Sequence, residues 1–176
     1  DDARLYMCYT EDNIPLCGGL AVSYGGKCAH VYGCSADHHR ELRPTYLSIV
    51  DDSPMGRDVL TKLQKHKVNC DHVLVRPDGL GLWLAVFDND GDVAGSISKR
   101  PDAYPLVGLL EREGDKIFAE ADSVVLQVDL HKDIVKKVFE LAEKHHTKLF
   151  ALVSNMSIAV ERRDFLQKFD CFICNQ

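Results

Sequence analysis

The sequence has no long apolar run and no excess of basic residues. No stretch approaches the ~20 consecutive apolar residues that a membrane-spanning helix needs. Lys and Arg number 21 against 27 Asp and Glu, which gives a net charge of −6. Binding to the phosphate backbone of a nucleic acid requires a basic surface. We therefore expect neither a membrane nor a nucleic acid among the partners of this chain.

The sequence also lacks the cysteine pattern of a disulfide-stabilised scaffold. Its seven cysteines are an odd number, scattered over 176 residues, a length sufficient for one domain with its own core. Small secreted scaffolds use even, dense sets of cysteines because their cores are inadequate. We therefore expect free thiols and a cytoplasmic location.

From about residue 45 the chain alternates between predicted strands and helices. Apolar or β-prone runs predict strands at residues 45–50, 72–75, 123–128, 149–153 and 171–174. Amphipathic stretches predict helices from Pro54, at 132–145 and at 158–168, whereas 104–119 reads as weakly helical and surface-like. This alternation predicts an α/β fold, with the strands at 45–50, 123–128, 149–153 and 171–174 in one mostly parallel sheet flanked by helices.

A β-hairpin interrupts this alternation. Residues 82–87 and 93–97 are two apolar runs joined by the sequence DNDGD, whose Asp-Gly pair suits a tight turn. Both faces of the first run are apolar, so it is either an ordinary core strand or a strand covered by a second subunit. We expect a homodimer or a higher oligomer with Trp83 or Phe87 at a subunit contact.

Three segments, taken in order, resemble the PfkB/ribokinase family of carbohydrate and nucleoside kinases. Residues 22–27 (VSYGGK) are similar to the family's Gly-Gly motif, and residues 49–60 (IVDDSPMGRDVL) to its Asp-rich segment. The hairpin followed by residues 121–125 (ADSVV) looks like the family's lid strands and the core strand after them. The resemblance covers nearly the whole chain and is closest to the pseudouridine-kinase-like branch.

The resemblance implies a ribokinase-like fold and ATP-dependent phosphorylation of a sugar or nucleoside hydroxyl by the parent protein, with Mg²⁺. Residues 1–176 would be the amino-terminal part of one domain, with a lid at about 80–98 and without the carboxyl-terminal ATP-binding half. Gly25 and Gly26 would lie under the bound sugar, and Asn175 would begin the family's Asn-x-x-Glu motif, which organises Mg²⁺ and the phosphates. The catalytic aspartate would lie beyond the last residue. We therefore expect the chain alone to be inactive and to bind neither ATP nor Mg²⁺.

One region departs from the family pattern. His30 stands where the family has an asparagine that bonds a sugar hydroxyl, and histidine differs from it in shape and titration. The following residues, 31–40, have no helical apolar stripe, which a local frameshift or a degraded gene copy would produce. Without the resemblance, Gly25 and Gly26 would read as a plain turn.

Two other functions remain open. The chain could be a non-catalytic remnant that serves as a partner-binding domain. It could also bind zinc through a cluster of thiols and imidazoles, although their spacing matches no standard zinc finger. The candidate zinc ligands are Cys28, His30, Cys34, His38, His39, Cys171 and Cys174.

Overall fold

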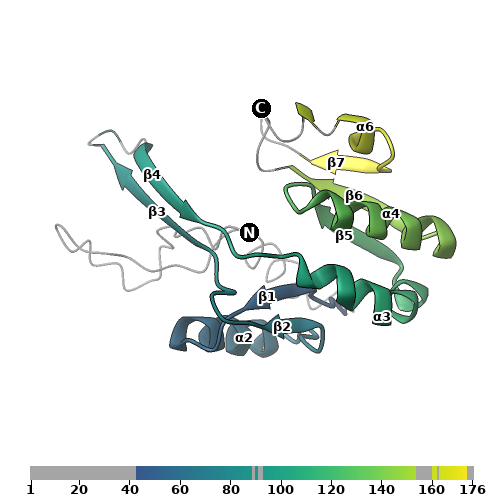
Figure 1. The fold of residues 1–176 in the computed structure, drawn as a ribbon, viewed down its shortest axis with the longest axis horizontal. Helices are drawn as coiled ribbons and strands as arrows, with labels where there is room; N and C mark the ends of the chain where they lie inside the picture. Colours follow the sequence, from purple (N-terminus) through teal and green to yellow (C-terminus); the bar gives the residue numbers. More distant parts are fainter. Residues whose placement is uncertain (1–42, 89, 91–92, 154–159, 162, 174–176) are drawn as a thin grey trace. The chain divides into compact units, whose positions relative to one another are not determined.

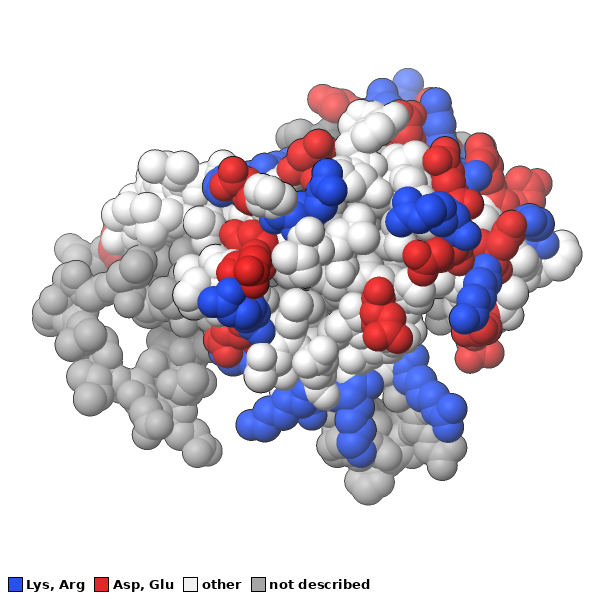
Figure 2. Space-filling model, turned by 60° about the horizontal axis from the view of Figure 1, so that its bottom comes forward, with Lys and Arg blue, Asp and Glu red and all other residues white. Residues whose placement is uncertain are grey.

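The computed structural model describes residues 43–173 except 89, 91–92, 154–159 and 162 (Figure 1). The chain divides into two compact units, Asp1–Asp102 and Ala103–Gln176, and each is considered by itself. Acidic and basic side chains are interspersed over the face shown in Figure 2. Within the described ranges, no helix is long and apolar enough to cross a membrane.

The first unit contains a two-stranded parallel sheet. Strand β1 (Ser48–Val50) pairs with β2 (Val73–Val75), and helix α2 (Pro54–Lys65) connects them. The helix begins where the sequence predicts, with Pro54 in its first turn, since that position needs no backbone N–H. Its buried face contributes to a small apolar core. The buried members of this core are Val50, Val59, Leu63, Val68 and Leu80.

The hairpin is confirmed and belongs to the same unit. Strand β3 (Leu82–Phe87) pairs in antiparallel fashion with β4 (Val93–Lys99). Leu84 lies opposite Ile97, and the register shifts at Phe87. The two strands form a sheet of their own, as predicted. Leu82, at the base of the hairpin, packs against the apolar core of the unit.

The second unit alternates helices with parallel strands. Its elements in chain order are α3 (Pro105–Glu120), β5 (Ser123–Gln127), α4 (Lys132–His145), β6 (Lys148–Leu152), α6 (Arg163–Leu166) and β7 (Cys171–Ile173). Strands β5, β6 and β7 form one parallel sheet, with Leu126 paired to Ala151 and Ala151 to Phe172. Helix α4 has the bounds that its amphipathic pattern predicts. The α/β class, with parallel strands, flanking helices and a small antiparallel sheet, is confirmed.

The expectation that residues 104–119 are weakly helical and surface-like is wrong. They form the regular 16-residue helix α3, and one of its faces is buried. The buried residues of that face are Leu106, Leu109, Leu110, Gly114 and Phe118. Gly108 and Gly114 interrupt the helix-forming residues and make the apolar stripe of α3 look weak in the sequence. Gly114, however, is buried against the Leu141 side chain of α4, which would have to shift to make room for a Cβ.

Two further expectations are met only within each unit. Strand β1 pairs in parallel with β2 in the first unit, and β5, β6 and β7 form a parallel sheet in the second, so one sheet shared by all of these strands stays a prediction. Sheet membership depends on backbone pairing with a neighbour far away in sequence, which the local pattern does not encode. The helix expected at 158–168 is represented by the short α6 and the helical residues 160 and 161, since 154–159 and 162 lie outside the description.

Candidate functional site

The residues that the sequence assigns to binding lie outside the described ranges. Gly25, Gly26 and His30 fall within residues 1–42, and Asn175 falls within 174–176. The cysteine and histidine cluster near residue 30 and Cys174 lie outside as well. Among the residues that the structure describes, no three His, Cys, Asp or Glu side chains gather as metal ligands, and Cys171 is an exposed free thiol.

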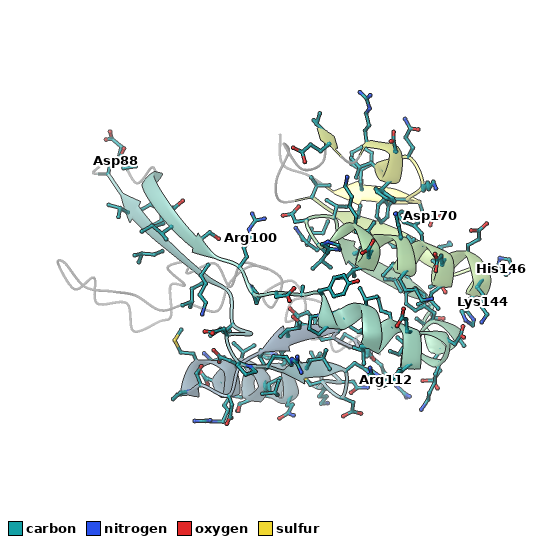
Figure 3. The ribbon with its side chains drawn as sticks, in the orientation of Figure 1. Asp88, Arg100, Arg112, Lys144, His146 and Asp170 are labelled. Atoms are coloured by element: carbon teal, nitrogen blue, oxygen red, sulfur yellow. The ribbon has the colours of Figure 1, made fainter. Side chains whose placement is uncertain are left out.

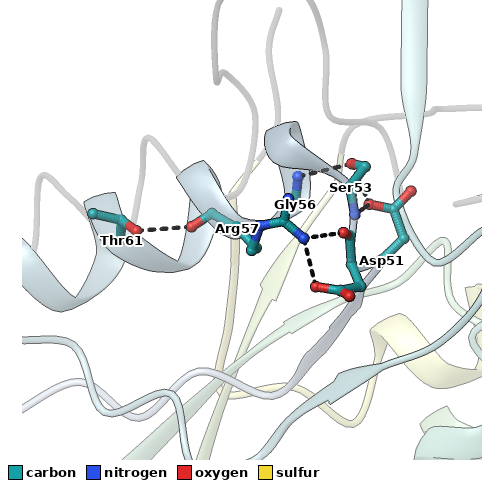
Figure 4. A network of polar contacts seen from close by, with 6 residues as sticks. Asp51, Ser53, Gly56, Arg57 and Thr61 are labelled. Carbon is teal, nitrogen blue, oxygen red and sulfur yellow. Dashed lines mark hydrogen bonds and ion pairs between the residues drawn. The ribbon is translucent and has the colours of Figure 1, made fainter.

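The connection between β1 and α2 is held by its own polar groups (Figure 4). Asp51 Oδ1 accepts hydrogen bonds from the backbone N–H of Ser53 at 3.1 Å and from its hydroxyl at 2.5 Å. Ser53 Oγ in turn accepts from the N–H of Gly56 at 3.1 Å, which caps the helix. The Arg57 guanidinium donates to the backbone oxygen of Asp52 and lies 2.8 Å from its carboxylate.

Gly56 is required in this connection for space. A Cβ at this position would lie 2.1 Å from the backbone oxygen of Asp51 and 2.6 Å from its Oδ1. The backbone of Gly56 is helical, so the requirement does not come from an unusual dihedral angle. Asp51, Ser53, Gly56 and Arg57 therefore have a structural role here: they fix the exit of β1 and the start of α2.

The carboxyl end of β5 carries a different set of side chains. Ligands of open α/β sheets bind outside the carboxyl ends of the parallel strands. Asp129 lies two residues after the end of β5, and its Oδ1 is buried. His131 then caps α4, with Nδ1 accepting from the N–H of Asp133 at 3.3 Å and lying 3.5 Å from its carboxylate.

Tyr104, immediately before α3, joins this group. Its ring packs edge-on against the ring of His131, with centroids 5.3 Å apart and an interplanar angle of 84°. Half of Tyr104 is exposed, and its side chain does not cap the helix. Helices α3 and α4 therefore both begin at the carboxyl edge of the sheet. We call Tyr104, Asp129, His131 and Asp133 the β5 edge cluster.

The opposite ends of the same two helices are also tied together. The carboxylate of Asp115 in α3 accepts a hydrogen bond from the Lys144 ammonium at 2.6 Å and lies 2.9 Å from Nε2 of His145. Figure 3 shows Lys144 in the last turn of α4. The bond from Lys144 is the main cause of the lowered pKa of Asp115, with a second contribution from His145. The buried Thr147 hydroxyl donates to the backbone oxygen of Phe118 at 3.3 Å. These contacts hold α3 and α4 side by side, pointing in the same direction.

The hairpin exposes apolar side chains. Val86 is 62% exposed and Ile97 72%, and Leu84, opposite Ile97, is 44% exposed. Phe87 is also exposed, while the side chain of Trp83 lies outside the description. An ordinary core strand would bury these residues, so that reading is wrong for Leu84, Val86 and Phe87. Near the base of the hairpin, Lys99 pairs with Asp78 at 2.9 Å and lowers the pKa of that carboxyl.

The β5 edge cluster was missed by reasoning from the sequence alone. A signal was present, because Asp129 and His131 lie within the first few residues after an apolar strand, where polar side chains reach the ligand-binding edge of a parallel sheet. Tyr104 gave no such signal. Its proximity to His131 depends on the packing of α3 against α4, which the expectation of a surface-like segment did not include.

Comparisons with known proteins agree with this fold. No model of a known protein family matches the chain. The chain is 34% identical over 160 residues to guanosine-inosine kinase from Exiguobacterium acetylicum. The aligned region covers 90% of this chain and 52% of that protein. The chain thus spans about half the length of the curated relative it matches.

Solved structures show the same fold at low identity. Ribokinase from Giardia lamblia superposes with a TM-score of 0.68 and 15% identity, covering 91% of this chain and 52% of that one. A PfkB family carbohydrate kinase from Listeria grayi superposes with a TM-score of 0.61 and 16% identity, covering 95% of this chain and 57% of that one. The ribokinase-like fold is therefore confirmed. The pseudouridine-kinase-like branch stays a prediction, because the curated relative carries another name.

Proposed function

The chain belongs to the PfkB/ribokinase family of kinases, and on this premise we propose that it is the substrate-binding, lid-bearing part of an ATP-dependent kinase. The reaction is the transfer of a phosphoryl group to a hydroxyl of a sugar or nucleoside. The observation that carries the proposal is the 34% identity to a guanosine-inosine kinase over 160 residues. That relative favours a purine nucleoside over a free sugar as the acceptor.

The parts of the chain have distinct roles in this proposal. The β5 edge cluster lies where parallel sheets bind ligands and contributes to the acceptor site. The hairpin β3–β4 is the lid, which excludes the water that would otherwise compete with the acceptor hydroxyl. Asp51 to Arg57 have a structural role, because they fix the connection between β1 and α2. Gly25, Gly26 and His30 remain candidates for contacts with the sugar, as the resemblance implies.

ATP and Mg²⁺ belong to the proposed reaction as phosphoryl donor and charge-neutralising ion. No described residue is assigned to either of them, and Asn175, the residue that the resemblance gives to Mg²⁺ and the phosphates, lies outside the description. Because the chain covers 52% of its relative, we expect the 176 residues alone to give no turnover. A reaction that uses ATP, together with the free thiols of Cys70 and Cys171 among the described residues, supports a cytoplasmic location as part of this proposal.

The exposed face of the hairpin supports a second element of the proposal, association of the chain with a copy of itself. Leu84, Val86 and Ile97 lie on one face, with Leu84 and Ile97 directly opposite each other. A two-stranded hairpin is marginally stable when both its faces meet water. Packing of two such faces would remove this apolar surface from water, at ~25 cal/mol per Å².

The test is a spectrophotometric assay of ADP formation by the protein in its full natural length. Guanosine, inosine, pseudouridine, ribose and fructose are offered one at a time with MgATP, and the 176-residue chain is assayed in parallel. We expect turnover by the full-length protein with at least one nucleoside and none by the 176 residues. Full-length protein that transfers no phosphate to any of the five acceptors would favour the non-catalytic, partner-binding alternative.

A further inference from the structure

We propose that Tyr104, His131 and Asp133 recognise the purine base of the nucleoside and give the site its preference for 6-oxopurines. The inference rests on the proposed function and names the part of the acceptor that these side chains contact. The rings of Tyr104 and His131 pack 5.3 Å apart, and the Asp133 carboxylate lies 3.5 Å from His131 Nδ1. All three stand at the starts of α3 and α4, beside the carboxyl end of β5.

The ring of Tyr104 is suited to stacking on a base. It is 51% exposed, although the helix that it precedes has a well-buried face starting at Leu106. An aromatic ring that only filled the core would be buried in this position. The edge-on contact with His131 fixes the plane of the Tyr104 ring, so little side-chain freedom is lost when a ligand stacks on it. Stacking of bases on aromatic side chains is a general means of binding them.

Asp133 supplies a hydrogen-bond acceptor next to the stacking ring. Its backbone N–H is used by the His131 cap, while its side chain is 47% exposed. An ionised carboxylate only accepts hydrogen bonds. Guanine and hypoxanthine present a donor at N1, and guanine adds the amino group at C2, so both can donate to this carboxylate. Adenine presents an unprotonated N1, whose lone pair would be repelled by the carboxylate.

The aliphatic sugars lack the features that this group of side chains selects. Ribose has no aromatic ring to stack on Tyr104 and no amide-like N–H to donate to Asp133. The arrangement therefore predicts a ranking of acceptors: guanosine and inosine first, then adenosine, with free ribose independent of both side chains. Discrimination by an unmatched hydrogen-bonding group in a binding site is large compared with discrimination by size.

The experiment measures kcat and KM of the full-length protein for guanosine, inosine, adenosine and ribose. The variants are Tyr104→Leu, Tyr104→Phe and Asp133→Asn. Phe172→Leu is the matched control for the ring, because Phe172 is 56% exposed but lies within strand β7. Asp122→Asn is the control for charge, since Asp122 precedes β5 at the opposite edge of the sheet. Thermal melting of each variant separates loss of fold from loss of recognition.

We expect Tyr104→Leu to raise KM for guanosine and inosine about tenfold, with kcat and the kinetics of ribose unchanged. Tyr104→Phe keeps the ring and restores the KM. Asp133→Asn should lower the ratio of kcat/KM for guanosine to that for adenosine about tenfold, because an amide can also donate to N1 of adenine. The two control variants should resemble the unmodified protein in all four substrates.

The outcomes separate this inference from the proposed function. If the full-length protein phosphorylates guanosine but neither Tyr104→Leu nor Asp133→Asn changes the guanosine kinetics or the preference over adenosine, the inference is wrong and the kinase function stands. Equal losses for ribose and guanosine would likewise overturn it, because they indicate a general structural defect. If no sugar or nucleoside is phosphorylated, the proposed function fails and the inference fails with it.

Discussion

Substitution of Gly56 by alanine tests how tightly the exit of β1 is built. The added Cβ would stand 2.1 Å from the backbone oxygen of Asp51, well inside any normal contact distance. Because that atom belongs to the backbone, no side-chain rotation relieves the overlap. Either helix α2 must move away from β1, or the chain between Asp51 and Ser53 must change its path.

The expected cost follows from three contributions. Overpacking in a well-packed site costs ~1–3 kcal/mol, and the rigid neighbour places this case at the upper end. Loss of the hydrogen bond from the Gly56 N–H to the Ser53 hydroxyl, which is 3.1 Å long, removes a cap worth ~1 kcal/mol. Alanine returns ~1 kcal/mol through its higher helix propensity. We therefore expect Gly56→Ala to destabilise the protein by about 3 kcal/mol, a large share of the ~5–15 kcal/mol typical of a folded domain.

Urea denaturation followed by circular dichroism measures this change, and Gly108→Ala provides the matched control. Gly108 lies inside helix α3, where an added Cβ meets only the Arg112 guanidinium, at 3.4 Å. That flexible group can move, so alanine should leave the stability unchanged or raise it by up to ~1 kcal/mol. If Gly56→Ala were as stable as the original protein, the close approach of α2 to Asp51 would be refuted.

Three further predictions concern the other contacts. Gly114→Ala should cost about 1 kcal/mol in urea denaturation, less than at Gly56, because its Cβ would lie 2.5 Å from a side-chain atom, Cδ1 of Leu141, that can shift. The hydrogen bond from Lys144 lowers the pKa of Asp115. The ionised carboxylate therefore stabilises the folded state at pH values above its ordinary pKa of ~3.9, and this stabilisation is lost as the pH falls through the lowered pKa. Asp115→Asn should therefore flatten the acid limb of the stability profile at low salt, and an unchanged limb would contradict the contact. Ile97→Lys should shift sedimentation velocity profiles toward the monomer if the 72%-exposed Ile97 lies in a subunit contact, whereas an unchanged profile would exclude this face from association.

The elements best predicted from sequence are those whose signals are local. Helix α4 has the expected bounds because its apolar stripe and its neighbouring strands are unbroken. Helix α2 begins at Pro54 because Ser53 and Pro54 are a strong start signal. The turn sequence between β3 and β4 similarly identifies the hairpin without reference to the rest of the chain.

The features that sequence reasoning missed depend on partners distant in the chain. Gly114 weakens the apparent stripe of α3, and only the Leu141 side chain on α4 explains why a glycine is suitable there. The apolar alternation of β3 does not reveal whether its faces are covered, so the exposure of Val86 could not be predicted. The pairing of β1 with β2 is also a matter of non-local hydrogen bonds.

The carboxyl ends of β1 and β5 differ in a way that bears on where a ligand would bind. After β1, the Asp51 carboxylate and the Ser53 hydroxyl are occupied by the start of α2, and a Cβ at Gly56 would already collide with the backbone. After β5, the Tyr104 ring and the Asp133 carboxylate are about half exposed. A ligand gains little from groups that are already satisfied within the protein, and more from groups that face water in a fixed orientation. Of the two strand ends, that of β5 therefore has the side chains suited to contact a substrate, while that of β1 holds the scaffold in place.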